Sequence, residues 1–310
     1  MSFITILTPA YNRAYVLPKL YLSLTEQTDH DFEWLVVDDG SQDDTEALVK
    51  GYIAENKIRI RYIKKKNGGK HDALNVGIEQ ITSKWTMIVD SDDRLTSNAI
   101  SEIRRYANRI FQYQPKRKIA GISFLRAYPD GKTNGKKPEQ NEVISDFIET
   151  RINRKDELAD KAEVYLTEVL KEFPFPVYEN EKFLQENIVW ISIALKYDMV
   201  FLNEAIYIGD YLEDGLTKNV MKNKLNNPIG MYQNAAMLMN RRFTSINQFK
   251  GALLFNIYYK LAHGSMWRGI CESPNRSLSA IGLLPSYIIY LYYIIKYKNL
   301  FQRKKGIDCG

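Results

Sequence analysis

Three aspartates gather within four residues, at Asp90-Ser91-Asp92-Asp93, directly after the apolar and β-prone run 85–89. Carboxylates at the carboxyl end of a buried strand are costly unless a cation neutralises them. Mg²⁺ and Mn²⁺ take oxygen ligands from a few carboxylates together with the phosphates of a substrate. The motif therefore predicts a site that holds a divalent metal against a phosphorylated ligand.

Alternating strands and helices are predicted to position these aspartates. Strands are expected at 3–8, 33–37, 58–63 and 85–89, and helices at 14–26, 43–54, 70–80 and 96–109. This alternation predicts a mostly parallel sheet with helices on both faces, an α/β fold of the Rossmann-like kind. Ligands of such sheets bind beyond the carboxyl ends of the strands. Polar clusters at 9–13, 38–41 and 90–93 fall at that edge.

The second half of the chain has a weaker pattern. Strands are predicted at 119–127 and 199–208, and helices at 144–150, 161–173 and 183–196. From about residue 226 the chain reads as wholly helical. We expect a catalytic domain over 1–220, with halves 1–110 and 111–220, and a helical extension over 221–310.

Composition excludes several classes of protein. The chain has 310 residues, of which 45% are hydrophobic and 26% charged, as in ordinary folded proteins. A net charge of +6 suits anionic ligands or an anionic membrane surface, and we expect no nucleic-acid partner. Cys271 and Cys309 form no CxxC pair, which argues against a zinc site or a disulfide framework. The N-terminus lacks a signal-peptide pattern.

Four segments at successive strand ends carry a shared pattern. They are TPAYNR at 8–13, VVDDGS at 36–41, NGGK at 67–70 followed by ALNVGI at 73–78, and VDSDD at 89–93. In this order and spacing they resemble the family 2 glycosyltransferases of bacterial surface-polysaccharide synthesis, which have the GT-A fold. The aspartate (DXD) motif alone would be a weak signal, whereas the four together are specific.

The resemblance implies that the loop after the first strand lines the base and ribose of a nucleotide, through Pro9, Tyr11 and Arg13. An aromatic ring such as that of Tyr11 offers a stacking face to a base. By the family pattern Asp39, rather than Asp38, would accept a hydrogen bond from the imide N–H of uracil. The alternative is an aspartate that only forms the following turn.

Lys70 follows two glycines and opens a predicted helix. Backbone amides and a lysine at a helix N-terminus suit a phosphate or a ribose, and the resemblance implies contact with the nucleotide. The alternative is a solvated lysine in a basic run. His71, which follows, is expected to be structural or solvated.

The resemblance also divides the aspartate motif between two tasks. Asp90, with Ser91, would contact the donor ribose, while Asp92 would hold Mn²⁺ or Mg²⁺ and Asp93 is a rival metal ligand. Asp90 and Asp92 would share one side only if the strand continued through them. The metal would stabilise the diphosphate leaving group as negative charge develops on it. The alternative is a cap for the next helix.

An inverting sugar transfer needs a carboxylate to take the proton of the acceptor hydroxyl. In similar enzymes this carboxylate sits in a Glu-Asp pair at a helix start, and here the pair reads Glu186-Asn187. Glu186 is therefore the candidate base, with Glu179 and Glu181 as alternatives, unless Glu186 only favours the helix through its dipole. Trp190 would either wall the sugar or acceptor pocket or pack in the core.

Two further segments carry weaker expectations. Many relatives have a histidine where this chain reads 211–217, and no histidine occurs there. Thr217 or Lys218 would meet phosphate instead. Residues 160–164 are a candidate for shaping the acceptor site.

The tail is apolar and then basic. Residues 278–295 contain no charge over 18 positions and precede Lys296, Lys298 and a basic run at 303–305. Tyrosines and a basic cluster favour a helix in the membrane interface over a buried helix or a membrane span. The protein would then work at the inner, cytoplasmic face of the cell membrane.

The sequence thus predicts a metal-dependent inverting glycosyltransferase. It would move a sugar from a nucleoside diphosphate sugar, with UDP favoured, to a hydroxyl of a glycan or lipid-linked glycan. A nucleotidyltransferase is the first alternative, but residues 9–13 are not the glycine-rich loop that such enzymes need. The second is a non-catalytic scaffold that kept the fold and binds nucleotide sugar or glycan.

Overall fold

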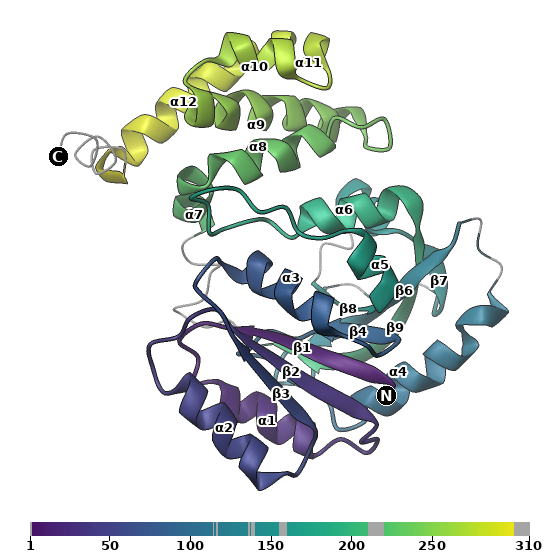
Figure 1. Ribbon diagram of the computed structural model, residues 1–310. Coiled ribbons are helices and arrows are strands. Elements are labelled where there is room, and N and C mark those ends of the chain that lie inside the picture. The colour runs from purple at the N-terminus through teal and green to yellow at the C-terminus, as the bar shows by residue number, and fades with distance from the viewer. Residues whose placement is uncertain are drawn as a thin grey trace. The chain divides into compact units, whose positions relative to one another are not determined.

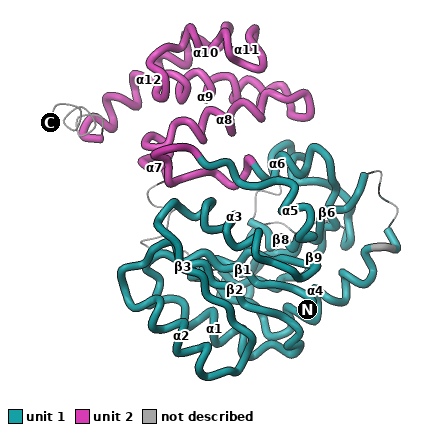
Figure 2. The backbone as a smooth tube through the Cα atoms, viewed as in Figure 1, with its two compact units in different colours: residues 1–177, 189–213 teal, residues 178–188, 214–310 magenta. Residues whose placement is uncertain are grey.

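The computed structural model describes residues 2–113, 115, 117–135, 137, 140–154, 160–209 and 220–300. The chain divides into two compact units, shown in Figure 2. Unit 1 comprises 1–177 and 189–213, and unit 2 comprises 178–188 and 214–310. The domain boundary expected near residue 220 adjoins 210–219, which lie outside the described residues.

The N-terminal half of unit 1 alternates strand and helix as predicted (Figure 1). Its elements are β1 (Ile4–Ala10), α1 (Leu17–Thr25), β2 (Phe32–Asp38), α2 (Thr45–Glu55), β3 (Ile60–Lys64), α3 (Lys70–Gln80) and β4 (Trp85–Ile88). These four strands pair in parallel in the order β3-β2-β1-β4, so their carboxyl ends share one edge.

The second half extends this sheet with strands of both directions. Its elements are β5 (Arg94–Leu95), α4 (Ala99–Arg109), η1 (Ile110–Gln112), β6 (Ile119–Ala127), β7 (Val143–Ser145), η2 (Ile148–Asn153), β8 (Lys161–Leu166), α5 (Thr167–Glu172), α6 (Asn187–Lys196) and β9 (Asp198–Ile208). The described residues form a nine-stranded sheet in the order β3-β2-β1-β4-β8-β6-β9-β5, with β7 paired to β9. The expected α/β fold with a mostly parallel sheet flanked by helices is therefore confirmed.

Two predicted helices were wrong. Residues 161–173 begin as strand β8 and only then become helix α5. β8 lies between β4 and β6 and is antiparallel to both, so it is buried by neighbours far away in the sequence. Residues 144–150 likewise begin in strand β7, which pairs with β9, before the π-helical turn η2. Tertiary pairing overrides local periodicity in both places.

Helices cover both faces of the sheet. Figure 1 shows α1 and α2 on one face and α3 on the other. On the first face the rings of Tyr21 and Tyr52 stack, with Trp34 of β2 beside them. On the second face α3 approaches closely at Gly77, where a Cβ would lie 2.4 Å from Leu7 Cδ1. This close contact fixes the N-terminus of α3 at the carboxyl edge of the sheet.

Unit 2 is helical over 220–300, as expected. Its helices are α7 (Val220–Asn226), α8 (Pro228–Met237), α9 (Ser245–His263), α10 (Met266–Glu272), α11 (Arg276–Ile281) and α12 (Leu283–Lys296). Side chains cap three of them, because Thr244, Ser265 and Asn275 accept hydrogen bonds from first-turn amides. Within the described part of the chain, no helix combines the length and apolarity needed to cross a membrane.

Candidate active site

The polar clusters predicted at the strand ends come together in unit 1. They follow β1, β2 and β4, and the fourth precedes α3. Because these three strands are parallel neighbours, their carboxyl ends meet at one edge. The cluster is held by hydrogen bonds between loops.

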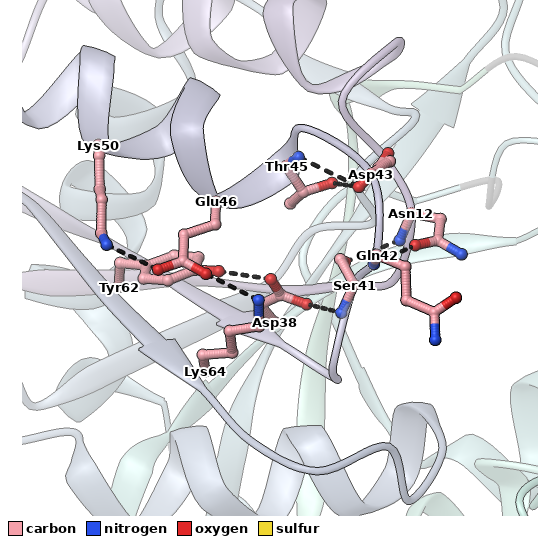
Figure 3. A network of polar contacts seen from close by, with 10 residues as sticks. All are labelled: Asn12, Asp38, Ser41, Gln42, Asp43, Thr45, Glu46, Lys50, Tyr62 and Lys64. Carbon is pink, nitrogen blue, oxygen red and sulfur yellow. Dashed lines mark hydrogen bonds and ion pairs between the residues drawn. The ribbon is translucent and has the colours of Figure 1, made fainter.

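The loop after β1 is tied to the loop after β2. Asn12 adopts a left-handed backbone (φ 54°), its amide donates to Ser41 Oγ at 2.8 Å, and its side-chain Oδ1 accepts from the Gln42 amide at 2.8 Å (Figure 3). Asparagine tolerates this backbone conformation better than most residues. The neighbouring Tyr11, in the loop after β1, is 46% exposed.

A second set of contacts orients Arg13. Its backbone amide donates to Thr45 Oγ1 at 3.0 Å, and the next amide, of Ala14, donates to Asp43 Oδ2 at 3.1 Å. The Arg13 guanidinium donates to Tyr15 Oη at 2.8 Å. Its positive charge contributes to lowering the pKa of Asp90, so Arg13 acts on the aspartate motif across the edge of the sheet.

Asp38 and Asp39 point in different directions, as predicted. Asp38 Oδ1 accepts from the Ser41 amide at 2.7 Å, and Oδ2 accepts from the Tyr62 hydroxyl (Figure 3). Asp38 is fully buried and stabilises its own turn.

Asp39 connects β2 to the glycine loop before α3. Its Oδ1 accepts from Lys65 Nζ and the Gly68 amide, both at 2.8 Å. Its Oδ2 accepts from Asn67 Nδ2 at 3.0 Å and from the Gly69 amide at 2.7 Å. A carboxylate has about four acceptor positions. A uracil N–H at Asp39 would therefore share or replace one of these donors.

Lys70 reaches the aspartate motif. Gly69, with φ 100°, precedes α3, and the Lys70 side chain extends from the first residue of the helix. Its Nζ lies 2.7 Å from Asp90 Oδ1, and both side chains are partly exposed. Lys70 is thus paired with the very motif that was expected to meet the donor.

His71, the next residue of α3, is buried. Its side chain is only 2% exposed, and its Nδ1 has no hydrogen-bond partner within the described parts of the chain. Burial lowers the pKa of this imidazole, so it is neutral at physiological pH.

The aspartate motif forms a turn rather than a continued strand. β4 ends at Ile88, and the Asp93 amide donates to the Asp90 carbonyl at 3.1 Å. The condition under which Asp90 and Asp92 would alternate along a strand is therefore not met. Within the turn the two carboxylates still interact, since burial and then the charge of Asp90 raise the pKa of Asp92.

Asp93 is turned toward the second half of the sheet. Its Oδ2 accepts from Arg126 Nη2 at 2.6 Å and from Tyr207 Oη at 2.6 Å. The Arg126 guanidinium lies 4.1 Å above the centre of the Tyr207 ring, and Tyr207 Oη also accepts from the Asp90 amide. Arg126 and Tyr207 thereby fix the turn, and no motif in the sequence had pointed to either residue. The one available signal was a charged residue near the end of an apolar strand.

The three carboxylates differ in charge balance. Burial alone would raise the pKa of Asp90, but the charge and hydrogen bond of Lys70 outweigh it and lower the pKa. Burial and the charge of Asp90 raise the pKa of Asp92. Burial also raises the pKa of Asp93, to about 6, although Arg126 opposes the shift. Asp92 and Asp93 both have a raised pKa, but Asp93 is paired with Arg126. Within the described residues Asp92 has no ion pair, so an added cation would stabilise its charged form most.

The donor set fits a metal shared with a substrate. Within the described residues no group of three or more acidic, histidine or cysteine side chains converges as a metal site. Mg²⁺ and similar cations are commonly held by one or two carboxylates, several waters and substrate phosphates. Asp92, with Asp90 nearby, meets that smaller requirement.

The remaining predicted residues lie farther along the chain. The Trp190 ring stacks on Tyr165 with centroids 4.9 Å apart, and it meets the Phe175 ring in a T-shaped contact with centroids 5.7 Å apart. Trp190 therefore belongs to an aromatic packing group of unit 1. Thr217 and Lys218 lie outside the described residues.

The three candidate bases belong to unit 2. Glu181 is buried, and its carboxylate accepts from the Ile229 amide at 2.6 Å and the Gly230 amide at 2.8 Å, at the start of α8. Glu179 is exposed, and Glu186 is half-buried directly before α6. Glu181 therefore stabilises the start of α8.

A partly buried carboxylate within 160–164 also belongs to unit 1. Glu163 lies on β8, and its Oε1 is 3.8 Å from Arg151 Nη1. Burial raises the pKa of Glu163, while Arg151 and Arg126 oppose the shift. Glu163 of β8 and Arg126 of β6 are thus partly buried charged groups, and Arg126 contacts the aspartate motif.

Comparison with known proteins gives a consistent result. Residues 5–155 match the family model "Glycosyl transferase family 2". The chain is 25% identical over 323 residues to the GalNAc(5)-diNAcBac-PP-undecaprenol beta-1,3-glucosyltransferase of Campylobacter jejuni, with 99% of this chain and 98% of that protein covered.

Two solved structures share the fold. Staphylococcus aureus TarS 1–349, in complex with UDP-GlcNAc, matches with a TM-score of 0.61 and 18% identity over 85% of this chain and 73% of TarS 1–349. The mannosyltransferase PcManGT of Pyrobaculum calidifontis, in complex with GDP-Man and Mn²⁺, matches with a TM-score of 0.56 and 13% identity, over 96% and 87% of the two chains. At such identities the likeness concerns the fold.

Proposed function

The chain is a family 2 glycosyltransferase with the GT-A fold, and on this premise we propose that it transfers a sugar from a UDP-sugar to a hydroxyl of a lipid-linked glycan. The observation that carries the proposal is the cluster at the edge of the sheet, where the Lys70–Asp90 ion pair adjoins Asp92. The UDP-sugar bound by TarS in its solved complex supports this choice of donor.

The donor would lie across the loops after β1, β2 and β4. Tyr11 would stack on the base, beside Pro9 and Arg13, because its ring is exposed at the edge of the sheet. Asp39 would accept the uracil N–H by exchanging one of its present donors. Binding of the base would then change the hydrogen bonds that Asp39 now makes with the glycine loop before α3.

The ribose and diphosphate would meet the far side of the cluster. Asp90 and Ser91 would contact the ribose. The Lys70 ammonium group would donate a hydrogen bond to a phosphate oxygen of the donor. Mn²⁺ or Mg²⁺ at Asp92 would supply neutralisation of the charge that develops on the diphosphate leaving group. The contacts of Asp93 with Arg126 and Tyr207 favour a role in fixing the turn over the rival role of metal ligand.

The transfer would invert the anomeric centre. The acceptor oxygen bonds to the anomeric carbon while the bond to the diphosphate oxygen breaks, and the hydroxyl proton passes to the carboxylate of Glu186. Glu181 is less suited, because its carboxylate accepts two amides of α8. Trp190, which is only partly buried, would border the sugar and acceptor region. An assay of anomeric configuration tests this step, and retention would overturn it.

The name of the Campylobacter relative supports the choice of acceptor. Its substrate is an undecaprenol-linked glycan, and the two proteins match over nearly their full lengths. A lipid-linked acceptor would require work at a membrane surface, as the apolar and basic tail predicts. The inner face of the cell membrane, where nucleotide sugars are available, is the proposed location.

The test is a calorimetric titration of UDP, GDP and CMP, with and without Mn²⁺, into the wild type and Asp92→Asn. We expect UDP binding that needs Mn²⁺ and that Asp92→Asn loses. Absence of nucleotide binding by a folded protein would favour the scaffold alternative, which the Asn187 departure from the Glu-Asp pair keeps open. A preference for GDP would overturn the uracil assignment at Asp39.

A further inference from the structure

Helix α12 of unit 2 has an inner face that packs on its own unit. Ser286 is fully buried, donates to the Leu253 carbonyl at 3.3 Å and accepts from Asn256 Nδ2 at 3.4 Å. Two helical turns after Ser286, Tyr293 packs against the hydrophobic cluster around Tyr258. These contacts fix the rotation of α12 about its axis, and therefore also fix which residues point outward.

The opposite face of α12 is exposed and apolar. Its members follow helical spacing of three or four residues, and their side chains are 41–75% exposed. We call this set the α12 stripe, and it comprises Leu284, Tyr287, Ile288, Leu291, Tyr292 and Ile295. Soluble proteins rarely expose a contiguous apolar surface of this kind without a partner for it.

The sequence that surrounds the α12 stripe carries charge of one sign. Residues 273–307 contain no aspartate or glutamate, whereas the same stretch contains Arg276, Lys296, Lys298 and the basic run 303–305. Lys296 lies at the C-terminal end of the stripe, with its Nζ 2.9 Å from Tyr292 Oη. The surface that would cover the stripe must therefore be apolar and carry negative charge.

We propose that the α12 stripe docks on an anionic lipid bilayer, with α12 in the plane of the headgroups. Tyr287 and Tyr292 flank the aliphatic residues, and tyrosine prefers the interface because its ring is apolar and its hydroxyl polar. The basic residues then meet anionic headgroups. The helix has 14 residues, too few to span a bilayer but suited to lying in its surface.

A second copy of the chain fits this surface less well. In a two-fold dimer the stripe of each copy would face the other, and each copy would bring positive charge at both ends of α12, from Arg276 and from Lys296 and Lys298. Like charges at such an interface repel. The bilayer is therefore the favoured occupant, and the dimer becomes one outcome of the test.

The test is flotation of the full chain with vesicles of phosphatidylcholine alone, or of equal parts phosphatidylglycerol and phosphatidylcholine. We expect binding to the mixed vesicles that weakens as salt is added. The double variant Ile288→Glu/Ile295→Glu should lower the partition coefficient at least about tenfold, because it removes two apolar contacts. Lys296→Gln/Lys298→Gln should lower binding to the mixed vesicles about tenfold or more.

The matched control is Leu22→Glu, a similar change at a 57% exposed leucine of α1 in unit 1, which should bind as the wild type does. Equal vesicle binding by the wild type and the isoleucine double variant would overturn the proposal. So would a wild type that ignores vesicles but forms a dimer in sedimentation velocity that the double variant loses. The assay contains neither donor nor acceptor, so its failure and the failure of the proposed transfer are separate results.

Discussion

Lys70 Nζ and Asp90 Oδ1 lie 2.7 Å apart, although one residue begins α3 and the other follows β4. The pair exists because β1 separates β2 from β4 in the sheet and α3 covers that same region at Gly77. The positively charged ammonium group of Lys70 is thus held at the aspartate motif before any ligand binds. Electrostatic preorganisation of this kind avoids rearrangement when a charged donor binds.

We predict that Lys70→Met weakens donor binding more than it affects folding. Loss of a charge-assisted contact should raise the Kd for UDP about tenfold or more, whereas the partly exposed pair contributes at most about 1 kcal/mol to stability. Calorimetry and urea unfolding measure the two effects. Lys70→Arg keeps the charge, so its Kd for UDP should lie between those of the wild type and Lys70→Met. Unchanged UDP affinity in Lys70→Met would contradict a role in the donor site.

Arg126→Met should destabilise unit 1, because it leaves the buried Asp93 carboxylate without its guanidinium partner. Removing one member of a buried ion pair costs about 3–5 kcal/mol in the free energy of unfolding. Urea denaturation measures the change. Tyr207→Phe, which removes a single hydrogen bond to Asp93, should cost about 1–2 kcal/mol.

A second change checks the cause of that effect. In the Arg126→Met background, Asp93→Asn should recover part of the lost stability, because it removes the unpaired charge. If the effects of the two changes on the free energy of unfolding simply add, Arg126 and Asp93 are not energetically coupled. That result would contradict the proposed role of Arg126 in stabilising the turn.

Stability should fall in mild acid because of His71. Burial lowers the pKa of His71 from 6.5, so below pH 6.5 the unfolded chain takes up a proton that the folded chain does not. The free energy of unfolding therefore decreases as pH falls from 6.5 toward the folded pKa, by up to about 1.4 kcal/mol per pH unit. Unfolding curves of His71→Gln should lose this component, and those of His30→Gln, at an exposed site, should keep it.

Glu186→Gln should lower kcat by about 10²–10⁴-fold with little change in UDP affinity, because a general base acts on the acceptor proton and does not hold the nucleotide. Steady-state kinetics with calorimetry separates the two quantities. Glu179→Gln, at an exposed position, is the matched control and should retain activity. Loss of activity in the control alone would transfer the role of base to Glu179.

Local sequence was sufficient for the first half of the fold. Strands β1 to β4 are apolar runs ended by polar residues, so their positions, their parallel direction and the loops with Tyr11, Asp39, Lys70 and Asp92 could be predicted. A buried strand between helices has a pattern that depends little on distant residues. The separate directions of Asp38 and Asp39 also follow from local geometry.

Long-range contacts decided the rest. Residues 161–166 became strand β8 only because β4 and β6 accept it between them, and spacing within the segment could not reveal those neighbours. Arg126 and Tyr207 reach Asp93 through the pairing of β6 with β9, and the turn at 90–93 replaces a continued strand. In the tail, composition identified an apolar and basic segment, but the packing of Ser286 selected the face that stays exposed. Periodicity records which residues are apolar, whereas the side on which each is covered depends on partners elsewhere in the chain.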